Sequence, residues 1–187
     1  MLVTRTADDE EAAVAQTDGR DDVPWLGPEQ LDDWLDLAAV MIRLPSALES
    51  QLQKDADLSQ FEYFVMAHLS ESPGREARMS ELAMMANGSL SRLSHVVSRL
   101  ERRGYVVRRQ SPDDGRATLA HLTDDGFAKL ADSAPGHVRR VRELVVDALT
   151  PEQLEALGAA CRVVLERIDA VDGTTFLQRP QRLGPGR

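Results

Sequence analysis

Residues 89–104 read SLSRLSHVVSRLERRG, and this stretch carries the signals that decide the fold class. Its apolar side chains recur at steps of three and four, which predicts a helix with one buried face. These residues are Leu90, Leu93, Val97 and Leu100. Ser89 is of a type that caps helix N-termini, and Gly104 of the type that ends helices in a left-handed conformation. We therefore expect one helix that begins at Ser89 and ends at Gly104.

The opposite face of this helix carries serine, arginine and histidine, and no acid before Glu101. Small hydroxyl side chains allow a helix to lie deep in a groove of DNA, while guanidinium groups reach phosphates or base edges. An ordinary solvated face is the alternative, although such a face usually mixes in glutamate and lysine. The predicted DNA contacts on this helix are Ser89, Ser91, Arg92, Ser94, His95, Ser98 and Arg99.

A short helix, ELAMMA, is predicted just before this stretch, with Ser80 as its cap and Asn87-Gly88 as the sharp turn after it. Two helices joined in this way have helix-turn-helix spacing, in which the second helix enters the major groove. Further helix signals lie at Pro28, Ser59 with Glu62, Pro73-Gly74, Thr123 or Asp124, and Thr150 with Gln153. Prolines inside two of these helices predict a kink or interruption at Pro45 and a bend near Pro135-Gly136.

Two alternating runs, 105–110 and 117–122, predict short strands joined by SPDDG. Ser111 to Asp114 fits a type I turn, and Gly115 fits the left-handed residue after it. We expect Asp114 to hold the guanidinium of Arg116 by a charge-assisted hydrogen bond. An arginine held at a hairpin tip suits the negative potential of a narrow minor groove. A surface ion pair worth about 0–1 kcal/mol is the alternative. The remaining predicted DNA contacts of this hairpin are Arg108 and Arg109.

The net charge of −9 is unevenly distributed. Residues 1–36 hold eleven acids against Arg5 and Arg20, so the other 151 residues balance at 20 acids and 20 bases. Residues 89–116 hold seven arginines against three acids, a local charge of +4. The field at a surface depends on local charge, so a polyanionic partner remains compatible with an acidic chain.

Several function classes are disfavoured by composition. A single cysteine, Cys161, rules out an internal disulfide framework and fits a reducing compartment. No apolar run is long enough for a membrane span, and the N-terminus does not resemble a secretory signal. The four histidines lack metal-ligand spacing, and no phosphate-binding loop or nucleophile motif is present. We therefore expect a cytoplasmic protein, nucleoid-associated when bound to DNA, that is not an enzyme and uses no cofactor or metal.

The stretches LSQFEYFVMAHLSE and MSELAMMANGSLSRLSHVVSRLERRGYVVRRQSPDDGRATLAHLTDDG together resemble the MarR family of bacterial winged helix-turn-helix regulators. The resemblance covers roughly residues 30–171. It implies an obligate homodimer with a recognition helix in each of two major grooves and a hairpin wing in each flanking minor groove. The Asp-x-Arg wing motif of the family falls on Asp114 and Arg116. His95 stands where the family often has arginine, and Gly115 replaces a frequent second wing arginine.

The last predicted helix has apolar residues at near-heptad spacing, which fits either an intramolecular core or a helix seam between subunits. The resemblance favours a dimer interface shared with the first helix. The predicted interface residues are Leu31, Trp34, Leu154, Leu157, Cys161, Val164 and Ile168. A two-fold dimer would read a pseudo-palindromic operator. Within that seam Cys161 is expected to be a buried, inert thiol, which disfavours redox sensing.

The expected fold is mainly α with a small β-hairpin wing. A winged helix-turn-helix lobe (55–123) and dimerisation helices (27–54 and 124–172) form one domain over 27–172. An acidic arm (1–26), expected to be disordered, precedes it, and a flexible tail (173–187) follows. The expected function is a sequence-specific regulator of transcription, a repressor, that binds double-stranded DNA. A winged-helix module for protein–protein interaction is the alternative, and the acidic arm gives it some weight.

Many members of the family bind small molecules in a cleft between the dimer helices and the DNA-binding lobe, so the resemblance leaves a small-molecule effector open. The residues on elements that could line such a cleft are Trp34, Met41, Tyr63, Phe64 and His68. Each of them fits plain core packing at least as well. We therefore assign no ligand-binding residue.

Overall fold

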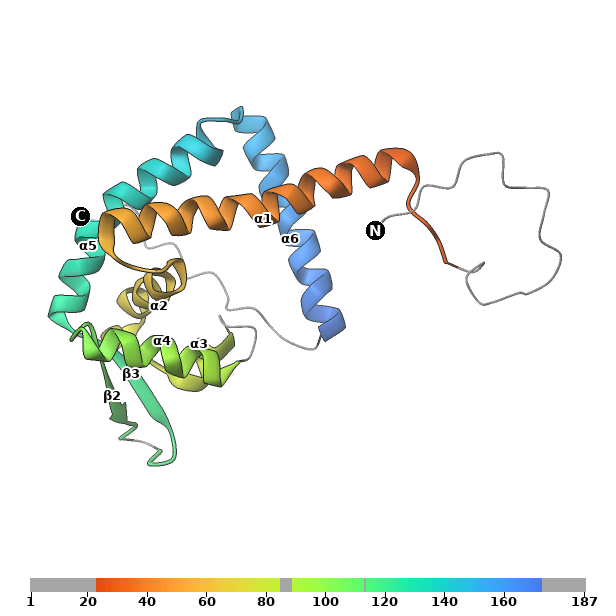
Figure 1. Ribbon diagram of the computed structural model, residues 1–187. Coiled ribbons are helices and arrows are strands. Elements are labelled where there is room, and N and C mark those ends of the chain that lie inside the picture. The colour runs from red at the N-terminus through yellow and green to blue at the C-terminus, as the bar shows by residue number, and fades with distance from the viewer. Residues whose placement is uncertain (1–22, 85–88, 113, 173–187) are drawn as a thin grey trace, which may run out of the picture. The chain divides into compact units, whose positions relative to one another are not determined.

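The computed structural model describes residues 23–84, 89–112 and 114–172, which are mainly helical with one small sheet (Figure 1). The helices are α1 (Pro28–Ala56), α2 (Gln60–Glu71), α3 (Met79–Met84), α4 (Leu90–Arg102), α5 (Asp124–Val141) and α6 (Pro151–Asp172). A 3-10 turn, η1 (Pro73–Arg75), follows α2, and a π-helical turn, η2 (Arg142–Val146), follows α5. The chain divides into two compact units inside α1, one ending at Val40 and the other beginning at Met41. The expected fold class, mainly α with a hairpin wing, is confirmed.

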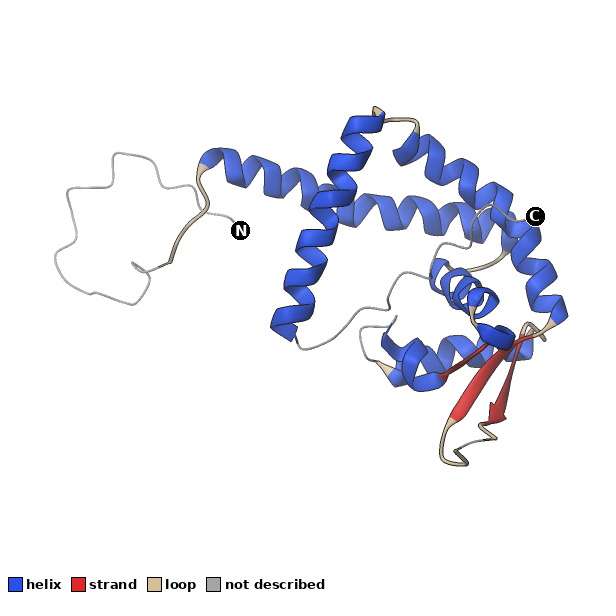
Figure 2. Cartoon of the chain, turned by 180° about the vertical axis from the view of Figure 1, so that it is seen from behind, coloured by secondary structure: helices blue, strands red, loops and turns tan. Residues whose placement is uncertain are grey.

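The sheet has three antiparallel strands in the order β1-β3-β2. The two expected strands are β2 (Val106–Gln110) and β3 (Thr118–Leu122), and they extend away from the helices toward the wing tip (Figure 2). The third strand, β1 (Glu76–Arg78), was not predicted. It has only three residues, too few for an alternating pattern, and it forms because its backbone pairs with β3, with Ala77 opposite Ala120.

One hydrophobic core joins the last turns of α1, helices α2 to α5 and the sheet. Burying each large apolar side chain contributes roughly 1.5–3 kcal/mol. The side chains in this core with almost no exposed surface include Leu52, Leu58, Val65, Met66, Leu69, Leu82, Leu93, Val97, Leu100, Val106 and Leu122. This core holds α4 and the wing as parts of one packed lobe.

The buried face of α4 differs from the predicted one at two residues. Leu90 was predicted to be buried, yet it is 52% exposed. Val96 is buried instead, so the inward residues are 93, 96, 97 and 100, the i, i+3, i+4, i+7 pattern of a helix face. Leu90 begins α4 and lines a notch beside the wing, outside the reach of the core.

Most of the predicted helix starts are confirmed by their hydrogen bonds. The Ser59 hydroxyl accepts from the Glu62 N–H at 3.1 Å, and the Glu62 carboxylate accepts from the Ser59 N–H at 2.8 Å. Thr150 and Gln153 form the same reciprocal pair at the start of α6. Ser89 and Thr123 cap α4 and α5. Gly104, which follows the C-cap residue of α4, has a φ of +77°. This is the left-handed conformation predicted for it, which glycine adopts readily because it has no Cβ atom.

Other local predictions were wrong. Helix α3 begins at Met79, so Ser80 lies inside it, and the Glu81 carboxylate accepts from the Arg78 N–H at 3.1 Å. Helix α1 runs through Pro45 without the predicted interruption, because a proline removes only one intrahelical hydrogen bond and a long helix retains the others. Helix α5 also continues through Pro135, and its ribbon changes direction along the helix, in agreement with the expected bend (Figure 1). The predicted turn at Asn87-Gly88 lies outside the described residues. Over the described ranges, no helix is long and apolar enough to cross a membrane.

Candidate nucleic-acid interface

Helix α4 presents a polar face opposite its buried one. Among the predicted contacts on this helix, Ser91, Arg92, His95 and Arg99 are exposed, whereas Ser89, Ser94 and Ser98 are partly buried. The predicted contacts therefore include side chains that face solvent and side chains that are partly covered by the rest of the lobe. Arg92 and Arg99 are two turns apart on the helix, so their guanidinium groups emerge on the same side.

The position of Arg99 is set by a buried acid on α2. Its Nε donates to Glu62 Oε1 at 3.0 Å, and Glu62 is only 5% exposed. The same carboxylate closes the capping box of α2 through its other oxygen. The Arg99 side chain remains 48% exposed, so its Nη groups stay accessible to a ligand while its Nε is anchored. Arg99 therefore presents a positioned cation on the surface.

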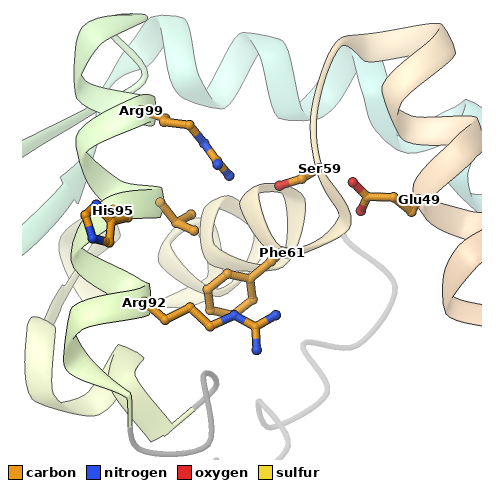
Figure 3. A pocket seen from close by; sticks show the side chains of 7 residues that line it. Glu49, Ser59, Phe61, Arg92, His95 and Arg99 are labelled. Carbon is orange, nitrogen blue, oxygen red and sulfur yellow. The ribbon is translucent and has the colours of Figure 1, made fainter.

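A groove of about 420 Å³ lies between this face of α4 and the start of α2 (Figure 3). Arg92 and Arg99 lie along its α4 side, with His95 between them, and Ser59 and Phe61 lie opposite. The Arg92 guanidinium stands 5.6 Å from the Phe61 ring centroid, in cation–π range. At the end of α1, the Glu49 carboxylate accepts from the Gln60 N–H at 2.6 Å, so an acid already occupies the N-terminus of α2.

Arg108, one of the predicted DNA contacts of the wing, has its guanidinium group hydrogen-bonded within the lobe. Its guanidinium lies against α4, where it donates to Glu101 Oε2 at 2.6 Å and to the Ser94 carbonyl at 2.8 Å. It also reaches the hydroxyls of Ser94 and Ser98 at 3.2–3.3 Å, and its side chain is 28% exposed. Sequence spacing could not reveal this, because the partner residues become neighbours only when β2 packs on α4. Arg108 joins the wing to α4, and its neighbour Arg109 is the exposed cation of β2.

The wing tip is built differently from the prediction. A hydrogen bond from the Ala117 N–H to the Asp114 carbonyl at 2.8 Å closes a turn over 114–117. The turn predicted over 111–114 includes Asp113, which lies outside the described residues. Asp114 Oδ1 accepts from the backbone N–H of Arg116 at 3.1 Å, an arrangement that forms a turn without a positive φ at Gly115. Asp114 therefore orients the main chain of Arg116, and its other oxygen lies 3.6 Å from Arg78 Nη1.

Arg116 itself is exposed at the tip. Among the residues that the structure describes, no acid pairs with its guanidinium. Sequence reasoning overlooked Arg78, which β1 and α3 bring next to Asp114 and Arg116 although 36 residues separate it from the nearer of the two. The isolated position of Arg78 in the sequence offers no signal for this proximity.

The predicted dimer residues lie on exposed or partly exposed surface of the single chain. Trp34, Leu157, Val164 and Ile168 are exposed, and Leu31 and Leu154 are partly buried. Cys161, which was expected to be buried in the seam between two subunits, is exposed in the single chain. Further apolar side chains are exposed along the same helix, at Val163, Leu165 and Val171.

Of the residues considered for an effector cleft, Tyr63 is buried, and Trp34, Met41 and Phe64 are exposed. His137, a buried residue of α5, has its ring centroid 4.5 Å from that of Tyr63, and no sequence pattern indicated this contact. Desolvation lowers the pKa of His137 below its ordinary value of 6.5. Within the described part of the chain, no cluster of histidine, cysteine or acidic side chains could hold a metal ion.

Comparison with known proteins agrees with this geometry. The MarR family profile matches residues 58–118, from two residues before α2 to the first residue of β3. The chain is similar to Sco3205, a MarR family transcriptional regulator from Streptomyces coelicolor whose crystal structure was determined in complex with DNA. The two sequences are 42% identical, and the two structures superimpose with a TM-score of 0.77. The similarity covers 82% of this chain and all of that one.

Two regulators of known sequence are more distant. MhqR of Bacillus subtilis, an HTH-type transcriptional regulator, is 28% identical over 56% of this chain, and the match spans 65% of MhqR, slightly under two thirds. IacR of Pseudomonas putida, an HTH-type transcriptional repressor, is 27% identical over 72% of this chain and 78% of its own length. The winged lobe, its arginine-bearing α4 and this similarity to Sco3205 together show that the chain belongs to the MarR family of transcriptional regulators.

Proposed function

We propose that this protein represses transcription by binding a specific double-stranded DNA operator as a homodimer. Helix α4 lies in the major groove, and Arg116 enters the adjacent minor groove. The observation that carries the proposal is the cationic face of α4, where Arg92 and Arg99 emerge on one side and Glu62 anchors Arg99. The DNA bound in the Sco3205 crystal structure supports the same use of the fold.

Each DNA contact has a separate task in this proposal. Arg92, His95 and Arg99 reach base edges or phosphates from α4, and Ser91 leaves room for the helix to approach. Arg116 contributes charge in the minor groove, where potential is most negative when the groove is narrow. Arg108, Ser94 and Ser98 keep the wing at a fixed angle to α4 and are assigned no direct contact, because their polar atoms already bind one another.

The dimer is proposed from the apolar surface of α6. Leu157, Val164 and Ile168 would be costly to leave in water, and a second copy with the same stripe would cover them. Two recognition helices in a two-fold dimer contact half-sites roughly 34–36 Å apart. A pseudo-palindromic operator follows. Repression is proposed because a dimer seated on a promoter excludes the polymerase, and IacR, a relative, is named a repressor.

The test is a binding titration with DNA from the region upstream of the chain's own gene, at several salt concentrations. We expect the logarithm of affinity to fall linearly with the logarithm of salt, at about −0.9 per neutralised phosphate. Arg116→Ala should lower affinity and flatten this slope while the thermal unfolding midpoint stays constant. If wild-type protein ignores genomic DNA at low salt, or if Arg116→Ala binds as wild type does, the proposed docking is wrong.

A further inference from the structure

We infer that the notch between the start of α3, the start of α4 and the wing tip binds one phosphodiester group of the operator backbone, with Arg78 as its main ligand. This inference rests on the proposed function and adds a contact that the family motif does not include. The notch has a volume of about 320 Å³, and its lining includes Arg78, Ser80, Leu90, Asp114, Arg116 and Thr118.

The position of the notch follows from how a winged helix meets a duplex. When α4 occupies the major groove and Arg116 occupies the neighbouring minor groove, one sugar-phosphate strand separates the two grooves. That strand must cross the protein surface between α4 and the wing. The notch is lined by the first residue of α4 on one side and by Arg116 on the other, so it lies on this crossing.

The side chains of the notch suit a phosphate. Arg78 is exposed, and its pair with Asp114 is long, at 3.6 Å, with both side chains partly exposed. Such a pair is weak in water, and a guanidinium has five N–H donors, so Arg78 can keep this contact and still bind a phosphate oxygen. Among the described residues that line the notch, the guanidinium groups of Arg78 and Arg116 outweigh the carboxylate of Asp114 by one positive charge.

Two further features are explained by the same assignment. The Glu81 carboxylate binds the Arg78 N–H at the start of α3, so this donor is taken and Arg78 contacts the phosphate through its guanidinium group. The Ser80 side chain is exposed in the lining of the notch, and its hydroxyl can donate to a phosphate oxygen. Leu90, whose exposure is not explained by core packing, would contact the apolar face of a deoxyribose.

The experiment compares Arg78→Gln with Arg139→Gln, which removes the same charge from an exposed site on α5 away from the notch. Affinity for an operator fragment that binds wild type is measured at several salt concentrations, and thermal unfolding checks that both variants fold. We expect Arg78→Gln to weaken binding roughly tenfold on every DNA sequence tested. The log–log salt slope should become shallower by about 1.8, because a dimer carries two notches at about 0.9 each. Arg139→Gln should leave both values close to wild type.

A second arm identifies the ligand as a phosphate. A neutral methylphosphonate is placed, one position at a time, along the strand between the recognition-helix groove and the wing groove. At one position per half-site, wild type should lose affinity while Arg78→Gln loses none, since the contact is already absent. If operator binding is normal but Arg78→Gln matches Arg139→Gln, or if no position shows this coupling, the notch is not a phosphate site. If wild type binds no DNA, the proposed function fails and this inference fails with it.

Discussion

Replacing Glu62 by alanine should weaken the fold and the DNA contact together, because one buried carboxylate serves both. Oε2 accepts from the Ser59 N–H at 2.8 Å, which holds the start of α2. Oε1 accepts from Arg99 Nε at 3.0 Å, which holds an arginine of the recognition helix. In the alanine variant the Ser59 N–H loses its acceptor at a partly buried site, and Arg99 Nε can bond only to water.

The expected loss can be worked out from these two contacts. A hydrogen bond to a charged acceptor contributes about 1.5–3 kcal/mol, and loss of a helix cap costs about 0.5–2 kcal/mol. The ion pair adds little, on the order of 0–1 kcal/mol, because the Arg99 side chain is half exposed. We therefore expect a loss of about 2 kcal/mol. For a chain of this length that loss lowers the unfolding midpoint by roughly 4–8 °C.

The assay is urea unfolding at fixed protein concentration, with Ser59→Ala as the matched control. Ser59→Ala removes the other half of the capping box, the Ser59 hydroxyl that accepts from the Glu62 N–H, and leaves the Arg99 contact in place. It should cost about 1 kcal/mol. In DNA titrations, Glu62→Ala should lower affinity in the wild-type background and have no effect when Arg99 is already alanine. Equal losses of stability in Glu62→Ala and Ser59→Ala, together with additive effects on DNA affinity, would refute the coupling.

Three other predictions concern the wing, the buried histidine and the dimer. Arg108→Ala should cost about 1–3 kcal/mol of unfolding free energy, since it leaves Glu101 and Ser94 without their guanidinium partner, whereas Arg109→Ala should leave stability within about 0.5 kcal/mol of wild type. Equal urea midpoints for these two variants would contradict the role given to Arg108. Desolvation lowers the pKa of His137 in the folded chain. Below the ordinary pKa of 6.5 the unfolded chain therefore binds more protons than the folded chain, and the free energy of unfolding should fall as pH drops through the folded pKa. His137→Gln should remove this component of the decline in urea unfolding between about pH 8 and pH 5, and parallel curves for the two proteins would show that the histidine contributes none of it. Leu157→Asp should shift the protein toward monomer in sedimentation experiments by placing a charge in the apolar surface of α6, and an unchanged dimer would exclude that surface as the interface.

Much of the helical organisation follows from the sequence by itself, because helix signals act over three or four residues. The Ser59–Glu62 and Thr150–Gln153 capping boxes, the Ser89 cap and the left-handed Gly104 all form where the local pattern predicts them. Each of these features depends on a hydrogen bond or a backbone angle within a few residues. The packing of the rest of the chain has little influence on them.

The tertiary structure decided which arginines point outward and which are tied down. Glu62 and Arg99 are 37 residues apart, and Arg108 reaches Ser94 across 14 residues, so no short-range pattern contains either contact. Strand β1 exists because β3 provides a partner, and Arg78 reaches the wing because that pairing brings it there. Side chains of one residue type have the same local preferences at every position, and only the packed neighbours determine whether a given guanidinium binds an internal acid or stays on the surface.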